Sequence, residues 1–325
     1  MPTMPAAIAT AQKRVVCQEV PIPEPTPGKV LVKSKLASIC GSDLHIVYLG
    51  WRVRKFPLPP GRPGHEGIGE IVDTGGTNFK NGESVLTVPK IWNSRAFAGY
   101  QLIEPEQLLR LPNTTQSSHL LMAQQLGTVI FACKQLPSVT DKTVAVIGQG
   151  SAGLFHNFIL KRLGAYKIIA IEPVPERLSI SKLMGADETI SVTGKQAIDA
   201  VMDLTNGEGV EIVVEAVGST DTLNQAIQLA KPWGSVAAFG LPDSSNKVPF
   251  DWDSFYFKSL KMHAVHSSQE VPGLPDFREA IKIIDSGELE MSPFVNHQFP
   301  IHQVQDAFDL AYSKQDGALK ICLTF

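Results

Sequence analysis

The chain has 325 residues, a 43% hydrophobic share and a formal net charge of −3 at pH 7, from 29 Lys and Arg against 32 Asp and Glu. The length allows about two domains, and nothing in the near-even charge balance points to nucleic acid or to an anionic membrane surface as a partner. No apolar run reaches the ~18 residues that cross a bilayer, and the first residues lack the basic flank and apolar stretch of a secretory signal. We therefore expect a cytoplasmic protein that binds neither nucleic acid nor a membrane.

The first part of the chain contains short segments of β type. Apolar or alternating runs at residues 15–16, 30–32 and 68–72 are separated by proline- and glycine-rich stretches at 21–28 and 57–63. Short strands with such punctuation predict a small barrel or sandwich.

From about residue 117 the pattern changes to alternating helices and strands. Helical spacing at 117–136 precedes a continuous apolar run at 144–147, as expected for a strand that a parallel sheet buries on both faces. The order then continues as helix 152–163, strand 167–171, helix 175–184, strand 211–216, helix 223–229 and strand 235–239. This alternation predicts a doubly wound α/β unit, followed by tail helices near 277–284 and 304–312.

The loop between the first strand and the first helix of this unit reads G-x-G-x-x-G. Its glycines allow a tight turn and a close approach of the backbone to a pyrophosphate, while the helix N-terminus offers unpaired N–H groups to the phosphates. Because the motif follows a strand and opens a helix, it is a specific indicator of a dinucleotide-binding site. The alternative is that the glycines serve only a tight turn. The expected phosphate contacts are Gly148, Gly150, Ser151, Ala152 and Gly153.

Glu172 ends the second strand of this unit, about 20 residues after the loop, where an acid binds the ribose hydroxyls. Because a carboxylate there repels a 2′-phosphate, we favour NAD over NADP as the cofactor. Arg177 is expected as a further cofactor contact. The alternative is that Glu172 is a solvated residue at the end of the strand and has no role in cofactor binding.

Two segments of the first part concentrate metal-binding residue types, namely C-G-S-D-L-H at 40–45 and G-H-E at 64–66. Thiolate, imidazole and carboxylate are ligands that zinc prefers, so Cys40, His65 and Glu66 could supply three of them. A cysteine or histidine alone is more often a structural residue, but the two segments together, upstream of a dinucleotide fold, are far more specific. None of the four cysteines forms a C-x-x-C pair, so we predict no disulfide framework.

With these motifs the chain resembles the medium-chain dehydrogenase/reductase superfamily, in its zinc-dependent alcohol and polyol dehydrogenase branch. The resemblance covers nearly the whole length and also includes residues 82–85, 97–100, 183–187 and 215–218. It implies a GroES-like, β-rich catalytic domain at 1–126, a Rossmann dinucleotide-binding domain at 127–264, and a return to the catalytic domain at 265–325.

The resemblance also implies roles for individual residues. Cys40 and His65 would ligate a catalytic zinc ion, with Glu66 beside it, and Asp43 would orient the imidazole of His65. Ser42 would hydrogen-bond the alcohol oxygen, and His45 would pass its proton to solvent. The strand ends that would line the nicotinamide, unless they serve sheet packing alone, are Val217, Gly218, Phe239, Gly240 and Leu241.

Two departures from the family pattern concern zinc. The position of the last protein ligand, a Cys or a Glu in the family, is held here by Gln124, a neutral amide that some sugar dehydrogenases of the branch share. The lobe that holds a structural zinc with four cysteines is missing, because residues 86–96 contain no cysteine. We therefore expect one catalytic zinc ion and no structural zinc.

These features predict an NAD-dependent dehydrogenase that moves a hydride between nicotinamide and a small secondary alcohol (polyol, sugar-like or amino alcohol) or its ketone. Trp51 and Trp92 are candidates for the substrate pocket or a subunit contact, and His263 and His266 are expected to be structural. Family analogy implies a homodimer or homotetramer. The alternatives are a zinc-free quinone or enone reductase of the same superfamily and a non-catalytic nucleotide-binding protein.

Overall fold

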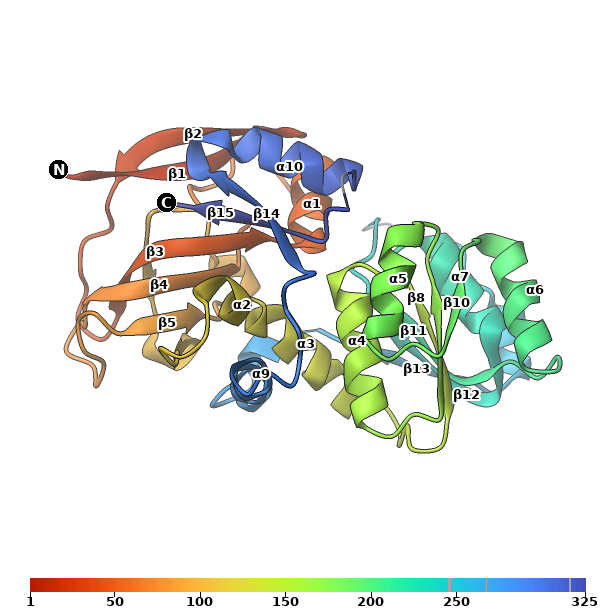
Figure 1. Cartoon of the computed structure of the whole chain (residues 1–325). Coiled ribbons are helices and arrows are strands. Elements are labelled where there is room, and N and C mark those ends of the chain that lie inside the picture. Colours follow the sequence, from red (N-terminus) through yellow and green to blue (C-terminus); the bar gives the residue numbers. More distant parts are fainter. Residues whose placement is uncertain (245–246, 267, 316) are drawn as a thin grey trace. The chain divides into compact units, whose positions relative to one another are not determined.

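The computed structural model describes residues 1–325 except 245–246, 267 and 316. The chain forms two compact units, of which the first comprises Met1–Thr128 with Ser267–Phe325 and the second comprises Val129–His266. The first unit is rich in antiparallel strands and the second contains a parallel sheet with helices (Figure 1). The predicted α/β class is thus confirmed.

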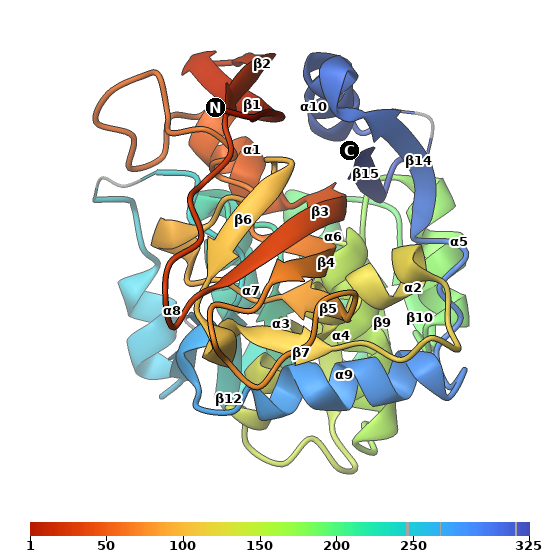
Figure 2. The ribbon, with the colours of Figure 1, turned by 90° about the vertical axis from the view of Figure 1, so that its left-hand side faces the viewer.

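A two-stranded hairpin and a seven-stranded sheet form the first unit. β1 (Thr3–Ala11) pairs with β2 (Arg14–Pro21), and the larger sheet has the order β14-β15-β3-β4-β5-β7, with β6 beside β3. Figure 2 looks onto this sheet and shows β3, β4 and β5 side by side. Its strands are β3 (Val30–Ile39), β4 (Glu66–Asp73), β5 (Ser84–Thr87), β6 (Tyr100–Ile103), β7 (Leu108–Arg110), β14 (Val295–Pro300) and β15 (Lys320–Thr324).

Helices close the apolar faces of the first unit. α1 (Gly41–Tyr48) and α10 (Val304–Ser313) share one buried apolar cluster with the hairpin, in which Val15, Val47 and Phe308 are members. α2 (Ser117–Leu121) packs against β3 and β4, and α9 (Pro275–Asp285) packs against α2. Short 3₁₀ turns lie at Ile91–Asn93, Pro105–Gln107, Ser268–Glu270 and Ile301–Gln303.

The sheet of the second unit has the strand order β10-β9-β8-β11-β12-β13, and all neighbouring strands are parallel. The chain runs outward from β8 to β10 and then returns to β11, so the order reverses between β8 and β11, where doubly wound sheets bind ligands. The strands are β8 (Thr143–Ile147), β9 (Lys167–Ile171), β10 (Glu188–Ile190), β11 (Val210–Glu215), β12 (Ala230–Ala238) and β13 (Lys261–Ala264).

Helices cover both faces of this sheet (Figure 1). α4 (Ser151–Arg162) and α5 (Pro175–Leu183) lie on one face, and α6 (Gly194–Leu204) and α7 (Thr220–Leu229) lie on the other. α8 (Trp252–Phe257) packs against α7, and α3 (Ala123–Lys134) begins in the first unit and ends in the second.

The structure differs from the predicted elements in several places, and α1, β10 and α6 are among the elements that were not predicted. The helix expected at 117–136 is two helices, α2 and α3, which meet at Met122. The hairpin strand β1 was not predicted, because its alanine-rich sequence with Pro5 has a low strand propensity. β1 forms through its pairing with β2 and through the burial of Ala7 and Ala9 in the core.

Candidate active site

The register of two antiparallel strands brings the two predicted metal-binding segments together. β3 ends at Ile39 directly before Cys40, and β4 begins at Glu66 directly after His65. Ser38 pairs with Glu66 in this antiparallel register, so Cys40, just after β3, lies opposite the residues just before β4. Potential ligand atoms of Cys40, His65 and Glu66 all lie within 4.8 Å of one another.

Asp43 ties the two segments to each other. The side chain is fully buried, and its Oδ2 accepts a hydrogen bond from the backbone N–H of Cys40 at 2.9 Å, which fixes the start of α1. Its Oδ1 lies 3.2 Å from Nδ1 of His65. Burial lowers the pKa of His65, but the charge of Asp43 and the thiol of Cys40 outweigh burial and hold that pKa well above its ordinary value. The site therefore attracts positive charge.

Glu66 is held by a buried cation from the far end of the sequence. Lys320 Nζ and Ser38 Oγ both donate to Glu66 Oε2, and Lys320 and Glu66 are each 1% exposed. The register of β15 with β3 pairs Ile321 with Ile39, which places Lys320 beside this carboxylate. Burial raises the pKa of Glu66, but Lys320 and His65 lower it below its ordinary value. Among the described residues, Glu66 Oε1 is buried without a hydrogen-bond partner.

Three further predicted residues lie on the helices of the first unit. Ser42 and His45 are half-buried on α1, and their spacing of three puts them on one face of the helix. Gln124 is 2% exposed in the first turn of α3, directly after α2, which packs against β3 and β4. Its amide Nε2 has no hydrogen-bond partner in the part of the chain that the structure describes.

The donor set of the first unit fits a zinc ion. Zinc bonds of about 2.0–2.3 Å place the ligands of a tetrahedral site roughly 3.3–3.8 Å apart, and the three candidate groups lie within 4.8 Å. Thiolate, imidazole and carboxylate together match the preference of zinc, and the unpartnered Glu66 Oε1 is a free acceptor at the site. Within the described ranges this is the one cluster of three or more such residues.

The glycine-rich loop of the second unit has the geometry that a dinucleotide needs. It connects β8 to α4, and Gly150 is the N-cap of the helix. A Cβ on Gly153 would lie 1.8 Å from the carbonyl oxygen of Gly148, so only glycine allows this close packing of helix and loop. The buried Gln149 anchors the loop, since its Nε2 donates to the carbonyl of Val146 at 3.0 Å.

Glu172 turns back toward this loop. Its Oε2 accepts the backbone N–H of Gln149 at 2.7 Å and its Oε1 accepts that of Val174 at 3.2 Å. Arg177 lies near the same loop, with Nη1 at 4.0 Å from the position that a Cβ of Gly150 would take. The loop is thus flanked by one carboxylate and one guanidinium.

The remaining cofactor candidates lie where β11 and β12 end, on the same edge of the sheet as the glycine-rich loop. Glu215 joins the two strand ends, because its carbonyl accepts the N–H groups of Phe239 and Gly240 at 3.0 and 2.9 Å. Its carboxylate accepts the N–H groups of Val217 and Gly218 at 2.8 Å each. The backbones are so close that a Cβ on Gly218 would lie 2.0 Å from the carbonyl oxygen of Leu241.

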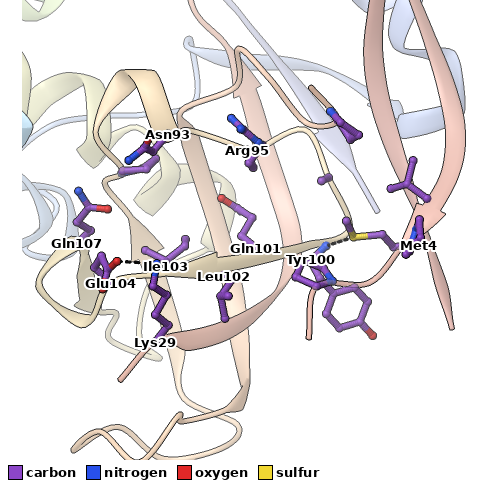
Figure 3. A pocket seen from close by; sticks show the side chains of 16 residues that line it. Met4, Lys29, Asn93, Arg95, Tyr100, Gln101, Leu102, Ile103, Glu104 and Gln107 are labelled. Carbon is purple, nitrogen blue, oxygen red and sulfur yellow. Dashed lines mark hydrogen bonds and ion pairs between the residues drawn. The ribbon is translucent and has the colours of Figure 1, made fainter. Parts of the chain in front are cut away.

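A cavity of about 460 Å³ lies over β6 in the first unit (Figure 3). Its wall includes residues of the shortened segment between β5 and β6, such as Arg95. Lys29 is paired with Glu104 at 2.9 Å, and Arg95 Nη1 donates to the carbonyl of Ser94 at 2.6 Å. Lys29 and Arg95 in the wall thus each have a partner within the protein. A larger cavity of about 730 Å³ in the same unit contains Trp51 and Trp92.

Sequence reasoning missed three residues that organise these sites. Lys320 and Ser38 hold Glu66, and Glu215 builds the turn at Val217 and Gly218. Glu215 stands at the end of an apolar strand, a signal that could have identified it. No local signal pointed to Lys320, which lies 254 positions from Glu66. His263 lies in β13, opposite Ala237.

Comparison with known proteins gives the same assignment for both units. The model of the alcohol dehydrogenase GroES-like domain matches residues 26–111, and that of the zinc-binding dehydrogenase family matches residues 152–286. An alcohol dehydrogenase of Cupriavidus necator is 26% identical, with 98% of each chain covered. An L-threonine 3-dehydrogenase of Pyrococcus horikoshii is also 26% identical, with 94% of each covered. The solved structure of alcohol dehydrogenase TADH from Thermus sp. ATN1 superposes with a TM-score of 0.82 at 26% identity, covering 99% of this chain and 100% of that one.

The chain belongs to the medium-chain dehydrogenase/reductase superfamily, in its zinc-binding alcohol dehydrogenase branch. It is an oxidoreductase that acts on the CH–OH group of an alcohol, in a family that works with zinc and a nicotinamide cofactor. The predicted family, fold and class of enzyme are confirmed. No helix among the described residues is long and apolar enough to span a membrane.

Proposed function

We propose that this protein interconverts a secondary alcohol and its ketone with NAD(H), at one zinc ion held by Cys40, His65, Glu66 and Gln124. The observation that carries the proposal is the convergence of a thiol, an imidazole and a carboxylate within 4.8 Å in the first unit. A zinc ion there supplies Lewis acidity toward the substrate oxygen, and the nicotinamide accepts or supplies the hydride.

The residues around this cluster have separate tasks in the proposal. Asp43 holds the ring of His65 by its Nδ1 side, which leaves Nε2 for the metal. Lys320 and Ser38 occupy Oε2 of Glu66, which leaves Oε1 as the oxygen that can reach an ion.

Two side chains of α1 transfer the proton of the substrate hydroxyl to solvent in this proposal. Ser42 hydrogen-bonds the hydroxyl of the substrate, and His45, one helical turn further, passes the proton to solvent. The half-buried position of both side chains supports this relay, since a proton carrier needs both the site and water within reach.

The cofactor is NAD in this proposal. The carboxylate of Glu172 is fixed beside the phosphate loop by two backbone N–H groups and would repel a 2′-phosphate. Arg177, whose Nη1 lies near Gly150, would neutralise the pyrophosphate. Val217, Gly218, Phe239, Gly240 and Leu241, at the carboxyl ends of β11 and β12, would line the nicotinamide.

The active protein is a homodimer or homotetramer in this proposal. Aromatic side chains of β12 and α8 are strongly exposed on the second unit, and a monomer rarely leaves such a patch uncovered. They are Trp233 at 80% exposure, Trp252 and Tyr256 at 62%, and Phe257 at 76%.

The substitution Cys40→Ser tests the metal cluster. Turnover should fall by more than about 100-fold. Loss of a group that supports a metal ligand lowers activity about 10- to 100-fold, and loss of the ligand itself should lower it more. The Kd for NADH, measured by fluorescence titration, should stay within about 2-fold, because the dinucleotide residues are in the second unit. Cys17→Ser, which removes a half-buried thiol outside the cluster, is the control. Retained turnover, or a parallel loss of NADH binding, would show the proposal to be wrong.

A further inference from the structure

The 730 Å³ cavity of the first unit has a strongly basic wall. It is formed mostly by the loop that connects the two metal-binding segments, together with Trp92. No acidic side chain is among the described residues that line it. The cationic residues of the wall are Arg52, Arg54, Lys55 and Arg62.

Two indole rings hold part of this charge in place. The rings of Trp51 and Trp92 are stacked, with centroids 6.4 Å apart and an interplanar angle of 12°. The guanidinium of Arg52 lies over Trp51 at 4.9 Å and that of Arg62 lies over Trp92 at 5.7 Å. Such cation–π contacts restrict the side chains before any ligand arrives and leave their N–H groups available.

Among the described residues, no carboxylate balances the charge of this cavity. Cations elsewhere on the unit have carboxylate partners, as in the pairs Lys35–Glu70 and Arg110–Glu83. In the described part of the chain, none of the four cations of the cavity forms an ion pair, and Nε of Arg62 is buried without a partner. Arg62 also lies near Arg95, a residue of the neighbouring 460 Å³ cavity, and its charge adds to burial in lowering the pKa of Arg95. An anion bound among the four cations of the cavity would balance their charge and accept hydrogen bonds from donors such as Nε of Arg62.

The cavity also lies within reach of the proposed metal site. Ile46 lines it and belongs to α1, whose N-cap is Cys40, so the two are about 9 Å apart along the helix axis. Arg62 precedes His65 by three residues, a chain distance of at most about 10 Å. Both distances are within the length of a six-carbon sugar alcohol.

We propose that the substrate is an anionic polyol, a sugar-length alcohol that carries a carboxylate or a phosphate. Its charged group binds Arg62, Arg54 and their neighbours, and its carbon chain packs against Trp51 and Trp92 while the reacting CH–OH lies at the metal cluster. This inference rests on the proposed function for the reacting end, and on the basic cavity alone for the charged end.

A substrate panel tests the charge requirement. Zinc-loaded protein with NAD is assayed with sorbitol, gluconate and sorbitol 6-phosphate, which present no charge, a carboxylate and a phosphate. The kcat/KM of at least one anion should exceed that of sorbitol by about 100-fold, and the advantage should shrink as KCl is raised. A kcat/KM for sorbitol equal to or above that of both anions would overturn the inference.

Binding gives a readout that does not need turnover. Calorimetric titration of the zinc-loaded protein with gluconate, sorbitol 6-phosphate and inorganic phosphate should detect at least one of the three, and the preferred one identifies carboxylate or phosphate as the recognised group. Failure to bind any of them would overturn the inference. If an anion binds while no alcohol is oxidised, the proposed function fails and the anion site stands. If only neutral alcohols are oxidised and no anion binds, the anion site fails and the proposed function stands.

Variants locate the binding in the cavity. Arg62→Gln should raise the Kd and KM of the bound anion about 10- to 100-fold, the effect of losing a charged hydrogen bond, and should change the KM for sorbitol far less. Arg62→Lys should recover part of the loss. Arg54→Gln, at an exposed position, should weaken binding without risk to folding. Arg14→Gln removes the same charge from β2, outside the cavity, and should leave the anion Kd unchanged. Equal effects of Arg62→Gln and Arg14→Gln would overturn the inference.

Discussion

At the scale of single residues, the candidate metal site depends on a buried ion pair that the sequence could not reveal. Cys40, His65 and Glu66 were recognisable because their types and local spacing resemble a family motif. Lys320 has no such signal, because only the pairing of β15 with β3 brings it beside Glu66. Residues whose roles depend on long-range register escape any local pattern.

The Lys320–Glu66 pair predicts a large effect on stability. Lys320→Met leaves the carboxylate of Glu66 buried without its cation, which should lower the free energy of unfolding by about 3–5 kcal/mol. Urea denaturation measures it. The double variant Lys320→Met/Glu66→Gln removes both charges and should recover part of the loss. A single variant as stable as the parent would contradict the buried pair.

Glu172 predicts a change in cofactor preference. Glu172→Gln removes the negative charge but keeps an oxygen that can accept the N–H of Gln149. The ratio of kcat/KM for NADP to that for NAD should rise about 10-fold, since one charged contact is worth ~1.4 kcal/mol or more. Glu176→Gln, which neutralises an exposed acid in the first turn of α5, is the matched control. An unchanged ratio in Glu172→Gln would count against the assigned role.

At the scale of elements, the strands of the second unit were predictable because each is a continuous apolar run between turn signals. The strands expected at 144–147, 167–171 and 211–216 appear as β8, β9 and β11, with ends shifted by at most one residue. The first unit was harder, because β1 and α1 are stabilised by tertiary packing rather than by their own propensity. The break at Met122 likewise has no local sequence signal.

His156 on α4 predicts a pH-dependent contribution to stability. The ring is fully buried against Phe239, with centroids 4.6 Å apart, and burial lowers the pKa of His156 to about 4. The unfolded chain takes up this proton near pH 6.5, so between pH 6.5 and 4 it binds more protons than the folded chain. Folding stability from this residue is therefore complete above pH 6.5 and is lost as the pH falls toward 4.

His156→Leu isolates this contribution. When the pH is lowered from 7 to 5, the free energy of unfolding of the parent should fall by about 2 kcal/mol more than that of the variant. His302→Gln, at an exposed position, should give a flat difference over the same range. A flat difference for His156→Leu as well would contradict the buried neutral imidazole.

At the scale of the whole molecule, the alternation of apolar runs and helical segments was enough for the fold class, and the motifs at 40–45, 64–66 and 148–153 were enough for the resemblance to the family. The substrate was not predictable in this way. Trp51 and Trp92 were candidates for a pocket wall, but the stacking of their rings and the gathering of four cations around them appear only in the folded unit. Specificity resides in loops whose conformation no periodic pattern encodes.

Zinc content and turnover, measured on the same preparation, test the metal proposal most directly. We predict about one zinc ion per chain, loss of turnover when a chelator removes it, retained NADH binding, and recovery of turnover when zinc is returned. Full turnover in a preparation free of zinc, or a second zinc ion bound to each chain, would contradict it.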